Sequence, residues 1–308
     1  NLTKGKITLP ANGYIDLEGT AAELQPVLTN INGAYKNDVT VTALDNLDPV
    51  KALAQLKAIN DATTGNVEVA AAAASALEGS IKDIHAALKG ITGFTADVTV
   101  TDTKYTLAQL KTIVDSGVSS IVLDVNAPLS GSVTDLTAVL AKVTGAYAGD
   151  ITVTGKYTLD DLASLNLENG VGAIKLANTS VALEGIATDL VTGLSDLKGY
   201  KGAVTVKDAL TNLDQLLAIN NATTGAITLV DQTADLSGSA ANILAAFKGI
   251  KSYATGDITV TGTDYKLADL KAINAITTDG ALIVTNPIAL TGNAKDLAAA
   301  LNGVTYGD

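Results

Sequence analysis

Aspartate is the residue type whose spacing most directly suggests chemistry in this sequence. Asp38, Asp97, Asp150 and Asp257 each precede a short run of alternating β-branched residues. Carboxylate oxygens are ligands that Ca²⁺ prefers, at about 2.3–2.6 Å from the ion. Repeats stacked two strands apart would separate these carboxylates by about 10 Å, and the fifth position of the series is Ala203. The pattern therefore predicts aspartates that cap turns and no metal site.

The single histidine has no evident partner for acid–base catalysis. His85 falls in a predicted helix, and the matching positions of the other repeats hold Gln25, Thr137, Val191, Leu244 and Ala298. General-base catalysis needs a proton donor or acceptor within reach. All 20 basic residues are lysine, and no nucleophile elbow, phosphate-binding loop or metal-ligand spacing is present. We therefore expect no enzymatic activity, no catalytic residue and no cofactor.

One aromatic residue recurs at the same place in each repeat. The series is Tyr35, Phe94, Tyr147, Tyr200, Tyr253 and Tyr306. Rings two strands apart would be separated by about 10 Å, whereas aromatic pairs interact at about 4.5–7 Å between ring centres. Two interpretations remain open: each ring covers a seam between helices and strands, or the rings form a ladder that binds sugars. These six residues are the candidate ligand or interface residues.

The elements that position these residues follow a repeat of about 53 residues. A strand phrase, "DVTVT" at Asp38, is followed by a helical phrase, "LAQLKAIN" at Leu53, with apolar residues on one stripe. A second strand phrase, "NVEV" at Asn66, precedes a second phrase, "LEGSIKDI" at Leu77, which we interpret as a helix. Strand, helix, strand and helix thus make two half-units per repeat, and the chain holds about eleven half-units.

This order predicts an α/β fold, a right-handed βα-repeat solenoid with one long parallel sheet and a row of helices. Val39 and Val41 are expected to face the helices, with Thr40 facing outward. We predict a single continuous solenoid over residues 1–308, without separate domains. Its boundaries are a half-unit at 1–34, then units at 35–93, 94–146, 147–199, 200–252 and 253–305. The linker at 230–235 is long enough for another short strand.

Composition excludes several classes of function. The net charge of −12 repels phosphate backbones, so nucleic acid is not an expected partner. No apolar run reaches the 18 residues of a membrane-spanning helix. Cysteine is absent, so the fold relies on neither disulfides nor thiolate metal sites.

The phrases "LAQLKAINDATTG" (53–65) and "LDQLLAINNATTG" (213–225) resemble repeats of large bacterial, notably cyanobacterial, secreted and cell-surface proteins. The likeness extends over most of the chain, although "LDDLASLNLENG" (159–170) departs from it. The resemblance implies an extracellular or cell-surface location and a structural or adhesive role.

Both ends of the sequence lie inside a repeat. "VTYGD" at 304–308 matches the phrase before a first-type strand, and "NLTKGKITL" at 1–9 matches "NATTGAITL" at 221–229. Solenoids normally end in polar caps, so we expect self-association through uncapped ends, into a filament, sheath or surface layer. The alternative is an adhesin stalk or carbohydrate-binding module, with glycans as partners of the repeated aromatics.

Overall fold

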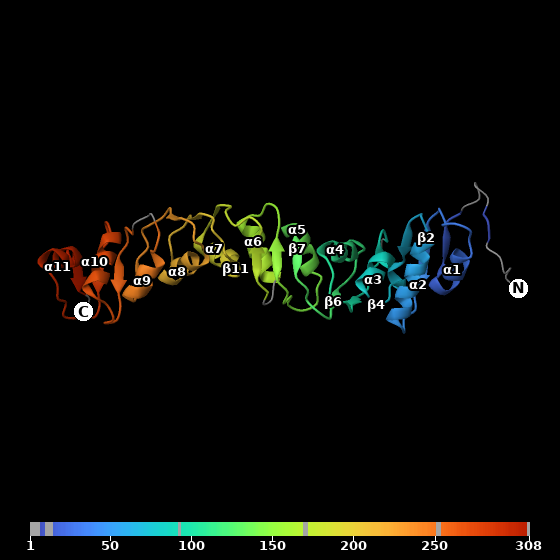
Figure 1. Ribbon diagram of the computed structural model, residues 1–308, viewed down its shortest axis with the longest axis horizontal. Helices are drawn as coiled ribbons and strands as arrows, with labels where there is room; N and C mark the ends of the chain where they lie inside the picture. Colours follow the sequence, from blue (N-terminus) through green and yellow to red (C-terminus); the bar gives the residue numbers. More distant parts are fainter. Residues whose placement is uncertain (1–6, 10–14, 92–93, 169–171, 251–253, 307–308) are drawn as a thin grey trace. The chain divides into compact units, whose positions relative to one another are not determined.

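The computed structural model describes residues 7–9, 15–91, 94–168, 172–250 and 254–306. The chain divides into two compact units, which are considered in turn. Unit 1 comprises Asn1–Ile151 with Glu168–Gly172, and unit 2 comprises Thr152–Leu167 with Ala173–Asp308. Along each unit short strands alternate with helices (Figure 1).

Unit 1 holds the elements from β1 to α5. In chain order they are β1 (Leu17–Thr20), α1 (Ala21–Thr29), β2 (Val39–Ala43), α2 (Pro49–Asp61), β3 (Val67–Val69), the 3₁₀ turn η1 (Ala71–Ala73), β4 (Leu77–Gly79), α3 (Ile81–Leu88), β5 (Val98–Val100), α4 (Leu107–Asp115), β6 (Ile121–Leu123), β7 (Leu129–Gly131) and α5 (Val133–Leu140). The strand β8 (Ile151–Val153) begins at the boundary between the units.

Unit 2 continues the alternation. Its elements are α6 (Leu159–Glu168), β9 (Ile174–Leu176), β10 (Leu183–Gly185), α7 (Ala187–Leu194), β11 (Leu197–Lys198), β12 (Val204–Val206), α8 (Leu213–Ala222), β13 (Ile227–Leu229), β14 (Leu236–Gly238), α9 (Ala240–Ala246), β15 (Ile258–Val260), α10 (Leu267–Ile276), β16 (Leu282–Val284), α11 (Ala294–Leu301) and β17 (Val304–Tyr306).

The strands pair in parallel, which confirms the predicted α/β class. In unit 1 the order is β1-β2-β3 in one sheet and β4-β5-β6 in another. In unit 2 the sheets include β10-β12-β13 and β14-β15-β16-β17. Each paired strand is separated from its partner by a helix, as parallel pairing requires.

The expectation of one long sheet is wrong, because the strands form several small sheets. The reason is an additional short strand at a place where the sequence predicts the start of a helix. The Leu-x-Gly residues of "LEGSIKDI" form β4, and helix α3 begins only at Ile81. Each such strand is the first strand of its sheet in chain order. Residues 230–235, all described, form no strand.

A close contact explains the glycine of these Leu-x-Gly strands. A Cβ atom on Gly79 would lie 2.5 Å from Cδ2 of Leu53, and one on Gly238 would lie 2.6 Å from Cδ2 of Leu213. Each of these leucines lies at or near the start of the preceding helix. The absence of a side chain thus lets that helix pack onto the strand.

The core lies between strands and helices, as the alternating pattern predicts. Val39, Val41, Ile227 and Leu229 are buried, whereas Thr40 on the opposite face is partly exposed. Thr106 caps α4 with a reciprocal Thr106–Gln109 capping box. No described helix has the length and apolar character needed to cross a membrane.

Asparagine side chains tie neighbouring helices together. The Asn60 amide of α2 donates to the Ala86 and Lys89 carbonyls at the end of α3, at 2.8 and 3.1 Å. The Asn220 amide donates in the same way to Ala245 and Lys248, at 2.8 and 2.9 Å. Carbonyls in the last turn of a helix have few partners within that helix, so the asparagines of these phrases supply hydrogen bonds to the end of the next helix.

Candidate functional site at the tyrosines and the open edge of unit 2

The structure buries most of the predicted aromatic series. Tyr35, Phe94, Tyr147 and Tyr200 are each at most 2% exposed. Tyr306 is 56% exposed, and Tyr253 lies outside the described residues. The four buried rings present no face on which a sugar could stack.

The hydroxyls of the buried tyrosines donate hydrogen bonds to the loops that precede the Leu-x-Gly strands. Tyr35 donates to the Ile15 carbonyl and Tyr147 to the Ala127 carbonyl. The Tyr200 hydroxyl donates to the Val181 carbonyl at 2.5 Å. These tyrosines therefore satisfy loop carbonyls that strand pairing leaves free.

A second series of tyrosines bonds to the same loops. It was not among the predicted site residues. The Tyr105 hydroxyl donates to the Val125 carbonyl at 2.5 Å and accepts from the Ala127 amide at 3.0 Å. Tyr157 and Tyr265 donate to the Asn178 and Asn286 carbonyls. The sequence signal for this series is a Tyr directly before the helix N-cap position, as in Tyr105-Thr106.

Burial keeps these phenols neutral. Burial is the main cause that raises the pKa of Tyr147 above its ordinary value, and the neighbouring Tyr105 raises it further. Burial likewise raises the pKa of Tyr200, with a smaller contribution from Tyr157. Neutral hydroxyls can donate to carbonyls, whereas phenolates cannot. The tyrosine hydroxyls therefore stay protonated at neutral pH and can donate to the loop carbonyls.

Three of the aspartates bond across to the residue before the next strand, whereas the sequence predicted caps of their own turns. The Asp38 and Asp257 carboxylates accept from the amides of Asn66 and Ala281, at 2.9 and 2.7 Å. The Asp97 carboxylate accepts from the Ser120 hydroxyl at 2.8 Å. Each bond joins consecutive strands. Within the described part of the chain, no three His, Asp or Glu side chains are grouped to hold a metal ion.

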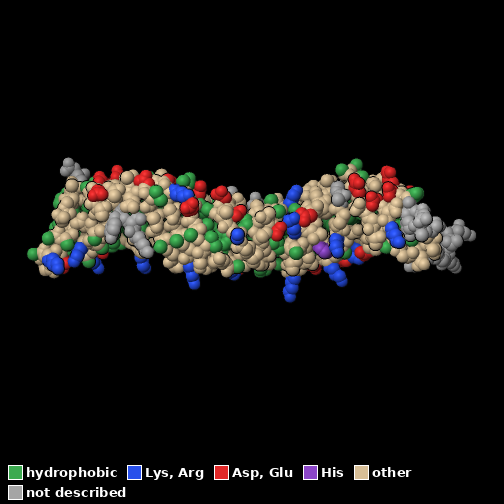
Figure 2. All heavy atoms as spheres, turned by 90° about the horizontal axis from the view of Figure 1, so that it is seen from above, with side chains coloured by type: hydrophobic (Ala, Val, Ile, Leu, Met, Phe, Trp, Pro, Cys, Tyr) green, Lys and Arg blue, Asp and Glu red, His purple; other side chains and the backbone are tan. Residues whose placement is uncertain are grey.

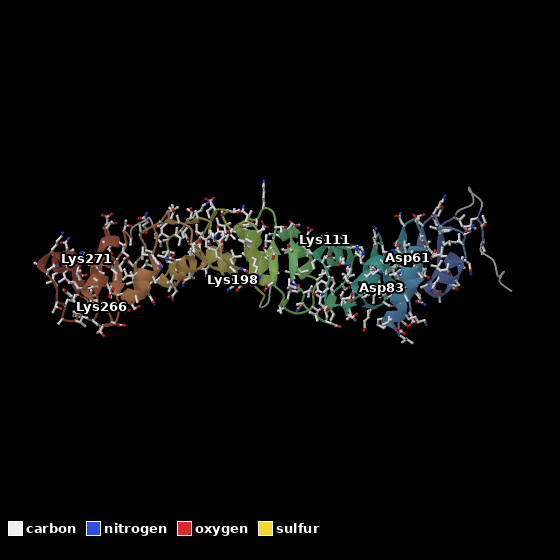
Figure 3. All side chains as sticks on the ribbon, viewed as in Figure 1. Asp61, Asp83, Lys111, Lys198, Lys266 and Lys271 are labelled. Atoms are coloured by element: carbon white, nitrogen blue, oxygen red, sulfur yellow. The ribbon has the colours of Figure 1, made fainter. Side chains whose placement is uncertain are left out.

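The charged side chains form exposed pairs. Lys111 on α4 pairs with Asp115, and Lys271 on α10 pairs with Asp296 on α11, both at 2.5 Å (Lys111 and Lys271 are labelled in Figure 3). On the face drawn in Figure 2, lysines stand among acidic and uncharged side chains and form no continuous basic area. Exposed pairs of this kind contribute little to stability.

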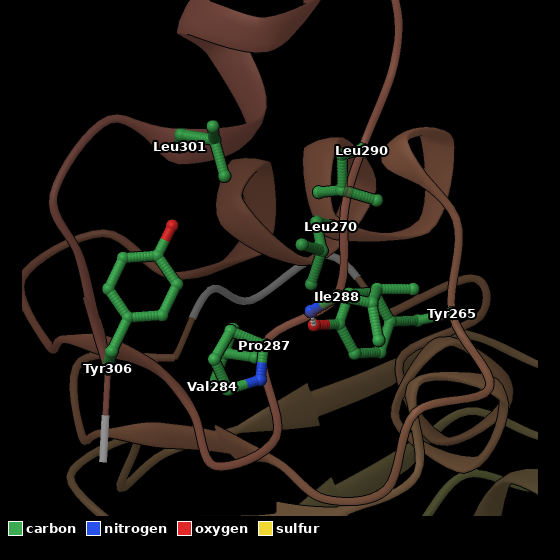
Figure 4. A pocket seen from close by; sticks show the side chains of 8 residues that line it. All are labelled: Tyr265, Leu270, Val284, Pro287, Ile288, Leu290, Leu301 and Tyr306. Atoms are coloured by element: carbon green, nitrogen blue, oxygen red, sulfur yellow. Dashed lines mark hydrogen bonds between the residues drawn. The ribbon is translucent and has the colours of Figure 1, made fainter. Parts of the chain in front are cut away.

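The C-terminal end of unit 2 carries an apolar pocket of about 320 Å³ (Figure 4). Its lining includes Tyr265, Leu270, Val284, Ile288, Leu301 and Tyr306. Ile288 is 37% exposed. The residues that match Leu301 in earlier repeats are buried: Leu88, Leu140, Leu194 and Phe247. The pocket is therefore the place where, earlier in the chain, the next repeat packs.

The backbone beside this pocket is an open strand edge. In β14 the Leu236 amide donates to the Asp257 carbonyl, and the Gly238 carbonyl accepts from the Thr261 amide, both at 2.8 Å. The matching residues 290–292 make no such bond to another described residue and are not assigned to a strand.

Comparison with known proteins gives no family model that matches the chain. No curated protein matches it either.

Proposed function

We propose that this chain is a structural repeat protein that self-assembles by stacking into a filament, sheath or surface layer. The observation that carries the proposal is the apolar pocket of unit 2, whose lining includes the exposed side chains of Ile288 and Tyr306. Exposed apolar surface of this kind gains from being covered by a partner. A heterologous contact of this type propagates when it does not close on itself.

We also propose the finer architecture and the location. The half-units, about eleven of them, follow one another as one right-handed βα solenoid over residues 1–308. Parallel pairing at successive helical crossovers supports this. The resemblance of the "LAQLKAIN" phrases to bacterial surface-protein repeats supports an extracellular or cell-surface location.

Glycan binding through the aromatic series remains an untested alternative. The burial of Tyr35, Phe94, Tyr147 and Tyr200 weighs against it. We therefore rank it below structural assembly.

Light scattering as a function of protein concentration tests the proposal. The wild-type mass should rise with concentration, and Ile288→Lys should lower the mass because it places a charge at the open pocket. Val230→Lys is the matched control, since Val230 is an exposed aliphatic residue of unit 2 outside the pocket lining. A wild-type mass that stays monomeric at every concentration would contradict the proposal.

A further inference from the structure

Helix α2 is longer than the helices at the matching positions of other repeats, because extra residues precede it. Val41 and Leu53 lie twelve positions apart, whereas the matching Val100 and Leu107 lie seven apart. The insertion lengthens the helix as well: α2 spans 13 residues and α4 spans 9. In repeat proteins, insertions of this kind often lie on the face that binds a partner.

The inserted turn is held in place by polar contacts. The Asp45 carboxylate accepts hydrogen bonds from the amides of Leu47 and Asp48, at 3.1 and 3.2 Å. It also pairs with the Lys51 ammonium group, at 2.6 Å. Leu47 is nevertheless 90% exposed and Val50 is 57% exposed. A well-bonded turn thus holds two aliphatic side chains in solvent, which is typical of a surface that binds a partner.

A groove of about 420 Å³ lies beside Val50, between α2 and the segment that contains β4 and the start of α3 (these elements are labelled in Figure 1). On α2 its lining consists of small and aliphatic side chains, and these are Val50, Leu53, Ala54 and Ala58. Their spacing places them on one face of the helix. On the other side of the groove, Gly79 of β4 has no side chain to fill it. The floor of the groove is therefore apolar.

The charged side chains of the groove leave it acidic. Lys57 pairs with Asp61, four positions later on α2, at 2.7 Å. On the other wall, Glu78 and Asp83 form no ion pair with any lysine among the described residues (Asp61 and Asp83 are labelled in Figure 3). An apolar floor beside two unpaired carboxylates is complementary to an aliphatic surface that carries positive charge.

We propose that this groove binds a basic amphipathic helix of a partner protein. Aliphatic side chains of the partner would pack on Val50, Leu53 and Ala54. Lysine or arginine side chains of the partner would pair with Glu78 and Asp83. A groove of this kind recognises partner residues that recur on one face of a helix, and the α2 side extends over about 16 Å, or about three helical turns. The groove is not the pocket of unit 2, so this proposal does not depend on the proposed assembly.

Fluorescence anisotropy with a labelled model peptide tests the proposal. The probe is a leucine–lysine peptide of about 18 residues, long enough to form a helix with its leucines on one face. The comparison probe carries glutamate in place of every lysine. Both are titrated with the full-length wild-type protein and with the variants Val50→Lys and Glu78→Gln. Val27→Lys is the control, because Val27 is a 48% exposed aliphatic residue of α1 in unit 1 outside the groove lining.

The leucine–lysine peptide should bind the wild-type protein. Its Kd should rise about ten-fold in Val50→Lys, because this variant introduces a positive charge into the groove. Glu78→Gln should raise the Kd several-fold, and Val27→Lys should leave it unchanged. The glutamate peptide should bind the wild-type protein at least about ten-fold more weakly.

Three results would overturn the proposal. One is no binding of the leucine–lysine peptide to the wild-type protein. Another is an equal loss of affinity in Val50→Lys and Val27→Lys, since the peptide would then respond to net charge alone. The third is equal affinity for the two peptides, since the carboxylates would then not select the partner. Circular dichroism checks that each variant is folded, and the exposed Glu78→Gln keeps the test available if Val50→Lys does not fold.

Discussion

At the scale of single residues, buried hydroxyls and carboxylates connect each repeat to the next. The recurrence of Tyr147 and Tyr200 is visible in the sequence, but the carbonyls that they bond are not. Those carbonyls lie about 20 residues earlier in the chain, and only the folded structure brings them close to the tyrosine hydroxyls. The aspartates were predicted to cap turns locally, but Asp38 and Asp257 bond to residues 28 and 24 positions later in the chain, which the sequence alone does not reveal.

Replacing Tyr200 by Phe should destabilise unit 2. The substitution keeps the ring but removes the donor to the Val181 carbonyl, and an unsatisfied buried carbonyl costs about 1–3 kcal/mol. Urea denaturation would measure the loss. Tyr306→Phe is the control, because Tyr306 is 56% exposed and its hydroxyl can bond to water. Equal effects of the two substitutions would show that the buried hydrogen bond is unimportant.

Stability should fall in alkaline solution. The pKa values of Tyr147 and Tyr200 are raised in the fold, so their stabilising contribution is complete below the unfolded tyrosine pKa of about 10. It is lost as the pH rises above that value, since unfolding then releases protons. Thermal unfolding across pH 8 to 12 would measure this. The double substitution Tyr147→Phe and Tyr200→Phe should make stability fall less steeply with pH. An unchanged dependence of stability on pH would show that these two tyrosines do not cause the decline.

At the scale of elements, the sequence predicted the helices and the alternating strands but not the Leu-x-Gly strands. "LEGS" resembles a helix start, because Ser80 does cap α3 and Asp83 follows three residues later. Leu77 and Gly79 become a strand only because β5 lies alongside. Strand formation thus depends on a partner about 20 residues further on, which local periodicity does not reveal. The single long sheet was wrong for the same reason.

Gly238→Ala should destabilise unit 2 by about 1–3 kcal/mol, the usual cost of overpacking. The new Cβ would lie 2.6 Å from Cδ2 of Leu213, so α8 or β14 must move. Adding Leu213→Val, which shortens the opposing side chain, should recover part of the loss. Ser237→Ala, on the exposed face of β14, serves as the control. A Gly238→Ala protein as stable as the control would disprove the close packing.

Asn220→Ala should loosen the contact between α8 and α9. It removes donors to the Ala245, Ala246 and Lys248 carbonyls, with an expected loss of about 1–3 kcal/mol. Hydrogen exchange would show faster exchange at the end of α9 than in the wild type. Asn221→Ala, at an exposed neighbouring position, should leave that exchange rate unchanged. Equal exchange rates in the two variants would show that the Asn220 hydrogen bonds do not stabilise the end of α9.

At the scale of the whole molecule, the repeated βα pairing of each unit is the basis of the proposed assembly. Repeat proteins are stabilised mainly by contacts between neighbouring repeats. Unit 2 presents apolar surface at the pocket lined in part by Ile288 and Tyr306. The sequence did not reveal this pocket, because lining residues such as Tyr265 and Tyr306 lie far apart in the chain.

Electron microscopy of the purified chain over a range of concentrations tests the central claim most directly. Stacking through the apolar pocket of unit 2 predicts particles that join into filaments or ordered layers as the concentration rises, and assemblies that are shorter in Ile288→Lys protein. Dispersed single particles at every concentration, with the same appearance in both proteins, would contradict it.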